Sequence, residues 1–181
     1  LVISYRDDEL GLRHPLRGLL GEMSSSSITR RISLPPLSKI AVQTLVDSQD
    51  VNVDAAALYR QTGGNPFFVV EALVNPEGGI PASVRDAVLA RAARLSISAY
   101  AVLEAAAIIG QHVELWLLEA VTGAEAYTAE ECMHAGMLLA QDNRLVFRHE
   151  LTRETILEAI SPSRRQVLHL FQNPLLALCH L

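Results

Sequence analysis

The sequence has few aromatic residues, two cysteines and no long apolar run. Phe, Trp and Tyr make up 5% of its 181 residues, whereas Ala and Leu are abundant, which favours helices over sheets. The longest apolar runs, such as residues 105–109, are far shorter than the roughly 20 residues of a membrane-spanning helix. Cys132 and Cys179 match no metal-ligand spacing, so we expect reduced thiols in a cytoplasmic protein and no metal site.

The N-terminus lacks the features of a signal peptide, and the sequence does not begin with Met. The apolar residues 1–5 run directly into the charged residues 6–9, whereas a signal peptide begins with a positively charged region and continues with a longer apolar one. We therefore expect this sequence to be a piece of a longer protein. Its formal net charge is -5 and its pI is near 5.7.

Local patterns in the first half predict short elements separated by turn residues. Residues 1–5 are expected to form a short buried strand, residues 15–23 a helix, and residues 29–34 a short strand or an extended connector. Three helices should follow, since Ser38 is a good N-cap, Gly63-Gly64 a good C-cap pair, and Pro66 a good first helical residue. Their expected ranges are 38–46, 54–62 and 66–74. Residues 75–81, rich in Pro and Gly, mark a boundary.

Beyond that boundary the pattern predicts helices around one hairpin. Two short apolar runs, 138–141 and 144–148, flank Asp142-Asn143 and predict a β-hairpin. A last helix should begin near residue 163 and be interrupted at Asn173-Pro174. The other helices are expected over residues 83–94, 98–109, 112–121, 128–139 and 149–160. Helices followed by one hairpin and a further helix are the layout of a winged helix-turn-helix, so the fold class is mostly α.

Three segments, in this order, resemble STAND-type (AAA+-related) signalling ATPases of the kind found in large LuxR-type and MalT-like bacterial regulators. Residues 1–9, LVISYRDDE, resemble the strand and arginine of the sensor-1 region. Residues 62–73, TGGNPFFVVEAL, resemble the lid segment that carries a Gly-x-Pro motif. Residues 145–156, LVFRHELTRETI, resemble the winged-helix segment whose histidine closes the nucleotide site. With residues 81–85, the resemblance covers residues 1–169.

The resemblance implies four parts and a switch driven by exchange of ADP for ATP. Residues 1–36 would be a remnant of the nucleotide-binding domain, 37–79 a helical lid, 80–172 a winged-helix domain and 173–181 a tail. In such proteins a P-loop domain holds the phosphates and Mg²⁺, and the lid and winged helix close over the nucleotide. Signal transduction and regulation of transcription are the functions that this implies for the whole protein.

The sequence departs from the family pattern because it contains no P-loop motif. No Gly-x-x-x-x-Gly-Lys-Ser/Thr is present, and no apolar strand ends in the acidic residues that hold Mg²⁺. We therefore expect this chain by itself to be no enzyme and to hold ATP or ADP weakly or not at all. The phosphates would be held by a P-loop domain outside this sequence, which is its expected partner.

Five residues are the candidates for contact with the nucleotide. Gly64, Asn65 and Pro66 would present a rigid surface to the base; as plain turn chemistry they form a helix–helix corner. His149 would donate a hydrogen bond to a β-phosphate; as an ordinary residue it would cap or decorate the start of a helix. Arg6 would reach a γ-phosphate; the ordinary alternative is a surface ion pair with Asp7, Asp8 or Glu9.

Two other functions stay open. A DNA-binding winged helix would need a basic recognition helix, but residues 128–139 contain no Lys or Arg and carry Glu130 and Glu131. Residues 83–172 hold eight Arg, no Lys and eleven acidic residues, a net charge of -3, so DNA is not the expected partner. The second alternative is a helical interaction module. An apolar lid face without its covering domain would favour self-association.

Overall fold

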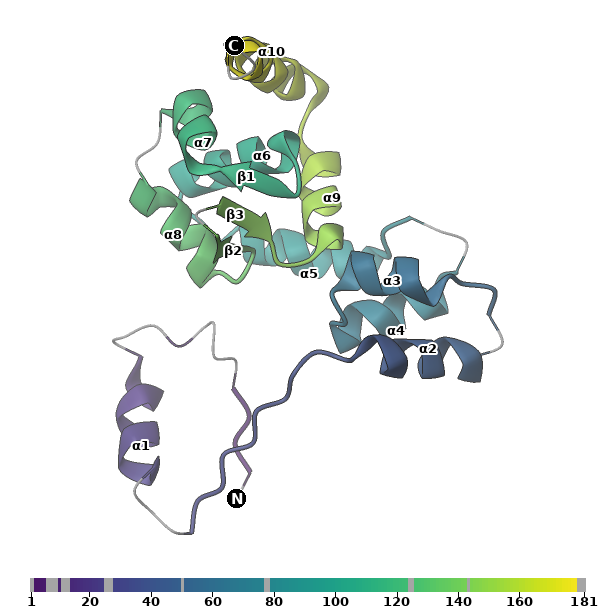
Figure 1. The fold of residues 1–181 in the computed structure, drawn as a ribbon. Coiled ribbons are helices and arrows are strands. Elements are labelled where there is room, and N and C mark those ends of the chain that lie inside the picture. The colour runs from purple at the N-terminus through teal and green to yellow at the C-terminus, as the bar shows by residue number, and fades with distance from the viewer. Residues whose placement is uncertain are drawn as a thin grey trace. The chain divides into compact units, whose positions relative to one another are not determined.

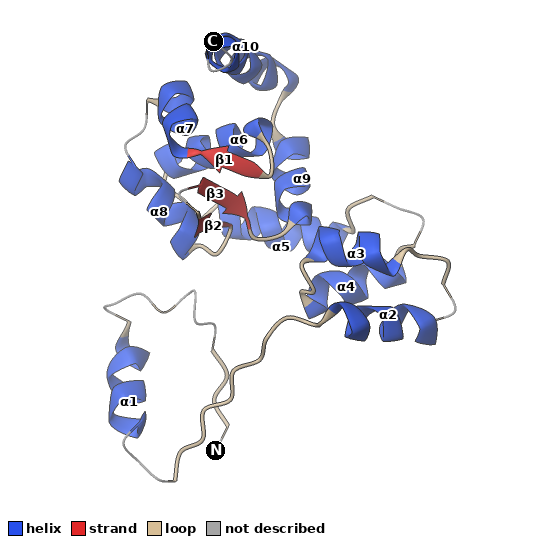
Figure 2. Ribbon diagram, viewed as in Figure 1, coloured by secondary structure: helices blue, strands red, loops and turns tan. Residues whose placement is uncertain are grey.

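The computed structural model describes residues 2–5, 10, 14–24, 28–49, 51–76, 79–123, 126–142 and 144–178; for residues 126 and 171–178 it describes the backbone alone. The chain forms two compact units, Leu1–Pro35 and Pro36–Leu181. Ten helices and three short strands occur within the described residues (Figures 1 and 2). The expectation of a mostly α fold is therefore confirmed.

The first unit contains one described helix, α1 (Pro15–Ser24), which begins with proline as predicted. The strand predicted near the N-terminus is wrong for the described residues 2–5, which have no strand partner and leave Val2 95% exposed. A strand needs a neighbouring strand to satisfy its backbone groups, and an apolar run alone does not provide one. Residues 29–34 adopt the extended connector rather than the strand alternative.

The second unit begins with three helices, and Ser38, Gly63 and Pro66 occupy the helix-end positions that were predicted for them. The helices are α2 (Lys39–Ser48), α3 (Ala55–Thr62) and α4 (Pro66–Val74). The Ser38 hydroxyl accepts a hydrogen bond from the Ala41 amide, and the Asp54 carboxylate accepts one from the Ala56 amide. One small apolar core joins the three helices, formed by Val42, Val46, Ala55, Leu58, Val69 and Leu73.

The rest of the second unit packs helices around a small antiparallel sheet. Its elements are α5 (Ala82–Ala92), α6 (Ile97–Ile109), β1 (His112–Glu114), α7 (Leu115–Thr122), α8 (Ala126–His134), β2 (Leu138–Gln141), β3 (Arg144–Phe147), α9 (Glu150–Ala159) and α10 (Pro162–Leu178). The strand order is β1-β3-β2, with His112 opposite Val146 and Leu138 opposite Phe147. The predicted hairpin is confirmed as β2 and β3, and Asp142 adopts a left-handed φ of 48° in its turn.

Three predicted element boundaries are wrong. The helix predicted from His112 begins at Leu115, because residues 112–114 pair with β3 instead. The helix predicted to end at Leu139 ends at His134, because Gly136 turns the chain with a φ of 67° and Leu138 enters the sheet. The last helix is not interrupted at residues 173–174, since the backbone of α10 stays helical to Leu178.

A second, larger core lies among α5 to α10 and the sheet, and α4 contributes to it as well. Phe147, Leu103, Met137 and Leu138 are among its fully buried side chains. Phe68 of α4 belongs to this larger core, whereas its neighbour Val69 belongs to the small core of α2, α3 and α4. No helix within the described residues has both the length and the apolar character needed to cross a membrane.

Candidate functional site

The corner between α3 and α4 depends on two consecutive glycines. Gly63 ends α3 in the left-handed conformation, with φ 59° and ψ 21°, and its amide donates to the Tyr59 carbonyl at 2.8 Å. Gly64 also has a positive φ of 73°. Its carbonyl accepts from the Leu37 amide at 2.8 Å, and a Cβ added there would collide with the Leu37 carbonyl. Only glycine combines this φ with so close a backbone contact, so the corner has a fixed shape.

Asn65 closes the corner and starts the next helix. Its side-chain carbonyl accepts from the Phe67 amide at 3.0 Å and from the Phe68 amide at 3.5 Å. This N-cap satisfies two amides that would otherwise lack a helical partner. Pro66 follows as the first helical residue and is exposed. The cap leaves the Asn65 amide nitrogen, Nδ2, to point away from α4.

His149 reaches the same corner from a distant part of the sequence. It lies between β3 and α9, in the N-cap position of α9, with an extended backbone and no side-chain cap bond. Its Nε2 lies 3.4 Å from Asn65 Nδ2. Its ring meets the Phe68 ring edge to face, with centroids 5.1 Å apart and an interplanar angle of 84°. The His149 side chain therefore does not cap α9, which was one form of the ordinary alternative.

Close packing of the imidazole against Gly63 completes the contact. A Cβ added to Gly63 would lie 2.9 Å from His149 Nδ1 and 3.4 Å from the Arg148 carbonyl oxygen. The first distance is too short for real Cβ contacts, so the absence of a side chain at residue 63 makes room for the ring. We call this set, Gly63, Asn65, Phe68 and His149, the corner cluster.

The structure thus brings two of the predicted site segments together. Asn65 and His149 are 84 residues apart in sequence and adjacent in the fold. Gly64 is buried and shapes the corner, whereas Pro66 is exposed beside it. Arg6 lies outside the described residues. Gly63 and Phe68 were not among the predicted site residues, although both occur in the same TGGNPFFVVEAL segment.

Neighbouring charges hold α9 in place. The Arg153 guanidinium donates to the Glu150 carboxylate at 2.7 Å and to the Ala107 carbonyl at 3.0 Å. Because Ala107 belongs to α6, this arginine ties the first turn of α9 to the larger core. Burial, and then the charge of Glu150, raise the pKa of Glu154 on the next turn. His149 therefore precedes a helix whose first turns are anchored to α6.

The chemistry of the corner cluster is that of polar recognition. Asn65 Nδ2 and His149 Nε2 face each other, and His149 Nδ1 is buried against Gly63, so a ligand would have to separate the two side chains to form hydrogen bonds with them. No group of three or more His, Cys, Asp or Glu side chains within the described ranges could hold a metal ion.

Cys132 is a free cysteine and is buried. Its thiol donates a hydrogen bond to the Ala99 carbonyl, and burial raises its pKa to about 12. A thiol in that state is a poor nucleophile.

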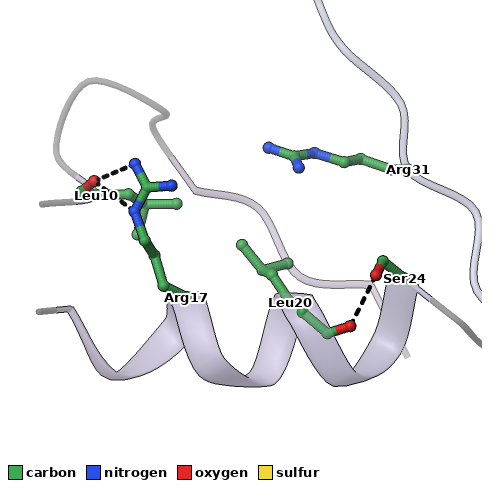
Figure 3. Close-up of a pocket in the computed structure, with 6 residues that line it drawn as sticks. Leu10, Arg17, Leu20, Ser24 and Arg31 are labelled. Carbon is green, nitrogen blue, oxygen red and sulfur yellow. Dashed lines mark hydrogen bonds between the residues drawn. The ribbon is translucent and has the colours of Figure 1, made fainter. Parts of the chain in front are cut away.

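A cavity of about 420 Å³ lies in the first unit, beside α1, and none of the predicted site residues that the structure describes lines it (Figure 3). It is lined by Leu10, Arg17, Leu20, Gly21, Ser24 and Arg31. Two of the Arg17 nitrogens donate to the Leu10 carbonyl, at 2.8 and 3.2 Å. The Arg31 guanidinium lies over the Tyr5 ring, 5.4 Å from its centroid. Both arginines thus hold the first unit together.

Comparison with protein-family models, with curated proteins and with solved structures gives no match to this chain.

Proposed function

We propose that this chain is the lid and winged-helix part of a nucleotide-switched regulator, which closes over an ATP or ADP molecule held by a P-loop domain of the same protein. In this proposal Pro66 contacts the base and His149 approaches the β-phosphate. Arg6 would approach the γ-phosphate. The chain regulates by sensing the nucleotide, and hydrolysis belongs to the P-loop domain.

The observation that carries the proposal is the contact between Asn65 and His149. Two segments that resemble separate parts of a nucleotide site meet at one corner, although nothing in the local sequence of either requires the other. Asn65 also presents Pro66 at the exposed start of α4. A ligand seated beside Pro66 would therefore lie next to the imidazole, as the proposal requires.

The arrangement of elements supports the finer description of the fold. The helices α2, α3 and α4 share a core of their own, as a small lid subdomain would. After them comes α5, followed by a helix, a strand, two helices and a hairpin, α6 to β3, with β1 paired to the second hairpin strand. This order is compatible with a winged helix-turn-helix, in which β2 and β3 form the wing.

A DNA-binding role has less support. The element that would enter the major groove is α8, which contains Glu130 and Glu131 and no Lys or Arg. Glu131 accepts hydrogen bonds from the amide and the hydroxyl of Ser96, at 2.6 and 2.7 Å, so α8 is tied to the start of α6 through an acidic side chain. DNA phosphates are bound by basic residues, and a phosphate facing this helix would be repelled. We propose the winged helix as an intramolecular element.

The test measures ADP release from a polypeptide that carries this sequence behind its P-loop domain. We expect His149→Ala to speed release of a fluorescent ADP at least tenfold, because the hydrogen bond that the imidazole would donate to a phosphate after leaving Asn65 is lost. His134→Ala is the control, since His134 is an exposed histidine at the end of α8. Equal release rates for wild type and His149→Ala would remove the proposed role, and a salt-sensitive DNA mobility shift would favour the DNA-binding alternative.

A further inference from the structure

The orientation of the Asn65 side chain is fixed by its own helix. Two α4 amides donate to its Oδ1, at 3.0 and 3.5 Å. If the amide were turned over, its NH₂ group would face those two N–H donors and the cap would be lost. The group that faces His149 is therefore Nδ2, which has hydrogens to donate and no lone pair to accept with.

That orientation restricts the protonation of His149. At 3.4 Å, Nδ2 can donate only to a ring nitrogen that carries a lone pair. Nε2 must then be unprotonated, and the proton of the neutral ring must be on Nδ1. A doubly protonated imidazolium would turn N–H toward N–H, and the contact would be lost.

We propose that Asn65 is a positioning residue for His149, which selects the neutral imidazole with the proton on Nδ1. When His149 takes up a second proton, the contact between the α3–α4 corner and the start of α9 opens. The inference concerns the residues of the proposed nucleotide site, but it rests on contacts within this chain and requires no nucleotide. It also means that Nε2, while docked on Asn65, has no hydrogen to offer a phosphate. Phosphate and Asn65 would compete for this atom.

Several charged groups on the elements around His149 form ion pairs with one another. On α9, Glu150 pairs with Arg153, and Glu158 pairs with Arg85 of α5 at 2.9 Å. The remaining interactions are Arg60 with Asp54 on α3, Glu71 of α4 with the Ser83 hydroxyl, Glu104 of α6 with Arg164, and Arg144 of β3 with Glu114. Arg148 precedes His149, Glu154 lies on the next turn of α9, and Tyr59 lies on α3. Among these groups, burial raises the pKa of the Glu154 carboxyl above its ordinary value.

The direction of the pH effect follows from the contact. Because the docked form is neutral, the folded chain binds the His149 proton less readily than the unfolded chain does. The stabilisation by this contact is therefore present above the ordinary titration range of histidine, near pH 6.5, and is lost as the pH falls.

The test uses long-range ¹H–¹⁵N correlation spectra of the imidazole nitrogens in the full chain. At pH 8 we expect His149 of the wild type to carry its proton on Nδ1. Asn65→Asp keeps the cap but replaces the donor by an acceptor carboxylate, so the His149 titration midpoint should rise by more than one pH unit, a tenfold increase in proton affinity. Asn65→Ser keeps a capping oxygen without the amide donor or the charge, and its midpoint should lie between the two.

Two results would overturn the inference: a wild-type proton on Nε2 at pH 8, or the same midpoint in wild type and Asn65→Ser. The wild-type spectrum decides even if a variant does not fold. His149→Gln identifies the resonances and removes the titration of this one histidine. Because no nucleotide is added, failure of this test leaves the ADP-release experiment unaffected, and unchanged ADP release leaves this inference unaffected.

Discussion

Replacing Gly63 by alanine tests the packing of the corner cluster, and the chain offers a matched control. Gly63 and Gly123 both end a helix in the left-handed conformation, with φ and ψ of 59° and 21° at Gly63 and 63° and 9° at Gly123. Among the described residues, a Cβ at Gly123 would meet nothing within 4 Å, whereas a Cβ at Gly63 would lie 2.9 Å from His149 Nδ1. The two substitutions share the backbone strain and differ in the collision.

The expected magnitudes follow from this difference. Left-handed alanine costs about 1 kcal/mol, so Gly123→Ala should lower the free energy of unfolding by about that amount. Gly63→Ala should also displace the imidazole and lose its hydrogen bond to Asn65, about 1 kcal/mol, and its edge contact with Phe68, about 1 kcal/mol. The total for Gly63→Ala is then about 3 kcal/mol.

Urea unfolding followed by circular dichroism measures both values, and a double-mutant cycle isolates the collision. In a His149→Ala background the ring is absent, so Gly63→Ala should cost only about 1 kcal/mol, the same as Gly123→Ala. If Gly63→Ala and Gly123→Ala cost the same in the wild-type background, the close packing of His149 on the corner is refuted.

Three further outcomes are expected. Hydrogen bonds from the Ser96 hydroxyl and amide lower the pKa of Glu131. The stabilisation of the folded chain by these bonds is therefore present above the carboxylate's ordinary titration range and is lost as the pH falls through the lowered pKa. Glu131→Gln should remove this loss of stability at acid pH, and an unchanged dependence of the free energy of unfolding on pH would contradict the argument. Cys132 has a pKa of about 12, so in a Cys179→Ser background it should react with a thiol reagent at pH 8 only after the chain unfolds. Stoichiometric labelling of the folded chain would be the contrary result. Val70→Asp, on an exposed apolar face of α4, should abolish any self-association seen by sedimentation velocity, whereas an unchanged dimer fraction would exclude this face.

Local signals predicted much of the second unit because their physical causes are local. The cap at Ser38, the start of a helix at Asp54 and the left-handed end of α3 at Gly63 each involve residues within one turn. The turn at Asp142 is likewise determined by the conformational freedom of a few residues. Such features can be predicted from short stretches of sequence.

Features that depend on distant partners were predicted poorly. Residues 112–114 form a strand only because β3 lies beside them, and nothing in three residues distinguishes this from the start of a helix. The apolar residues 2–5 lack such a partner among the described residues and form no strand. For the candidate site, the resemblance singled out Asn65 and His149 separately. Their hydrogen-bonding geometry and the roles of Gly63 and Phe68 required the structure.

Adjacent positions on α4 face different constraints because this helix serves two cores. Phe68 is embedded among residues of the C-terminal helices and sheet, while Val69 is fully buried against α2 and α3. A change of volume at residue 68 would have to be compensated near α5 or α9, and one at residue 69 near Val42 or Leu58. Homologous chains should therefore covary at these two neighbouring positions with separate sets of residues, and an insertion within α4 would misalign both sets at once.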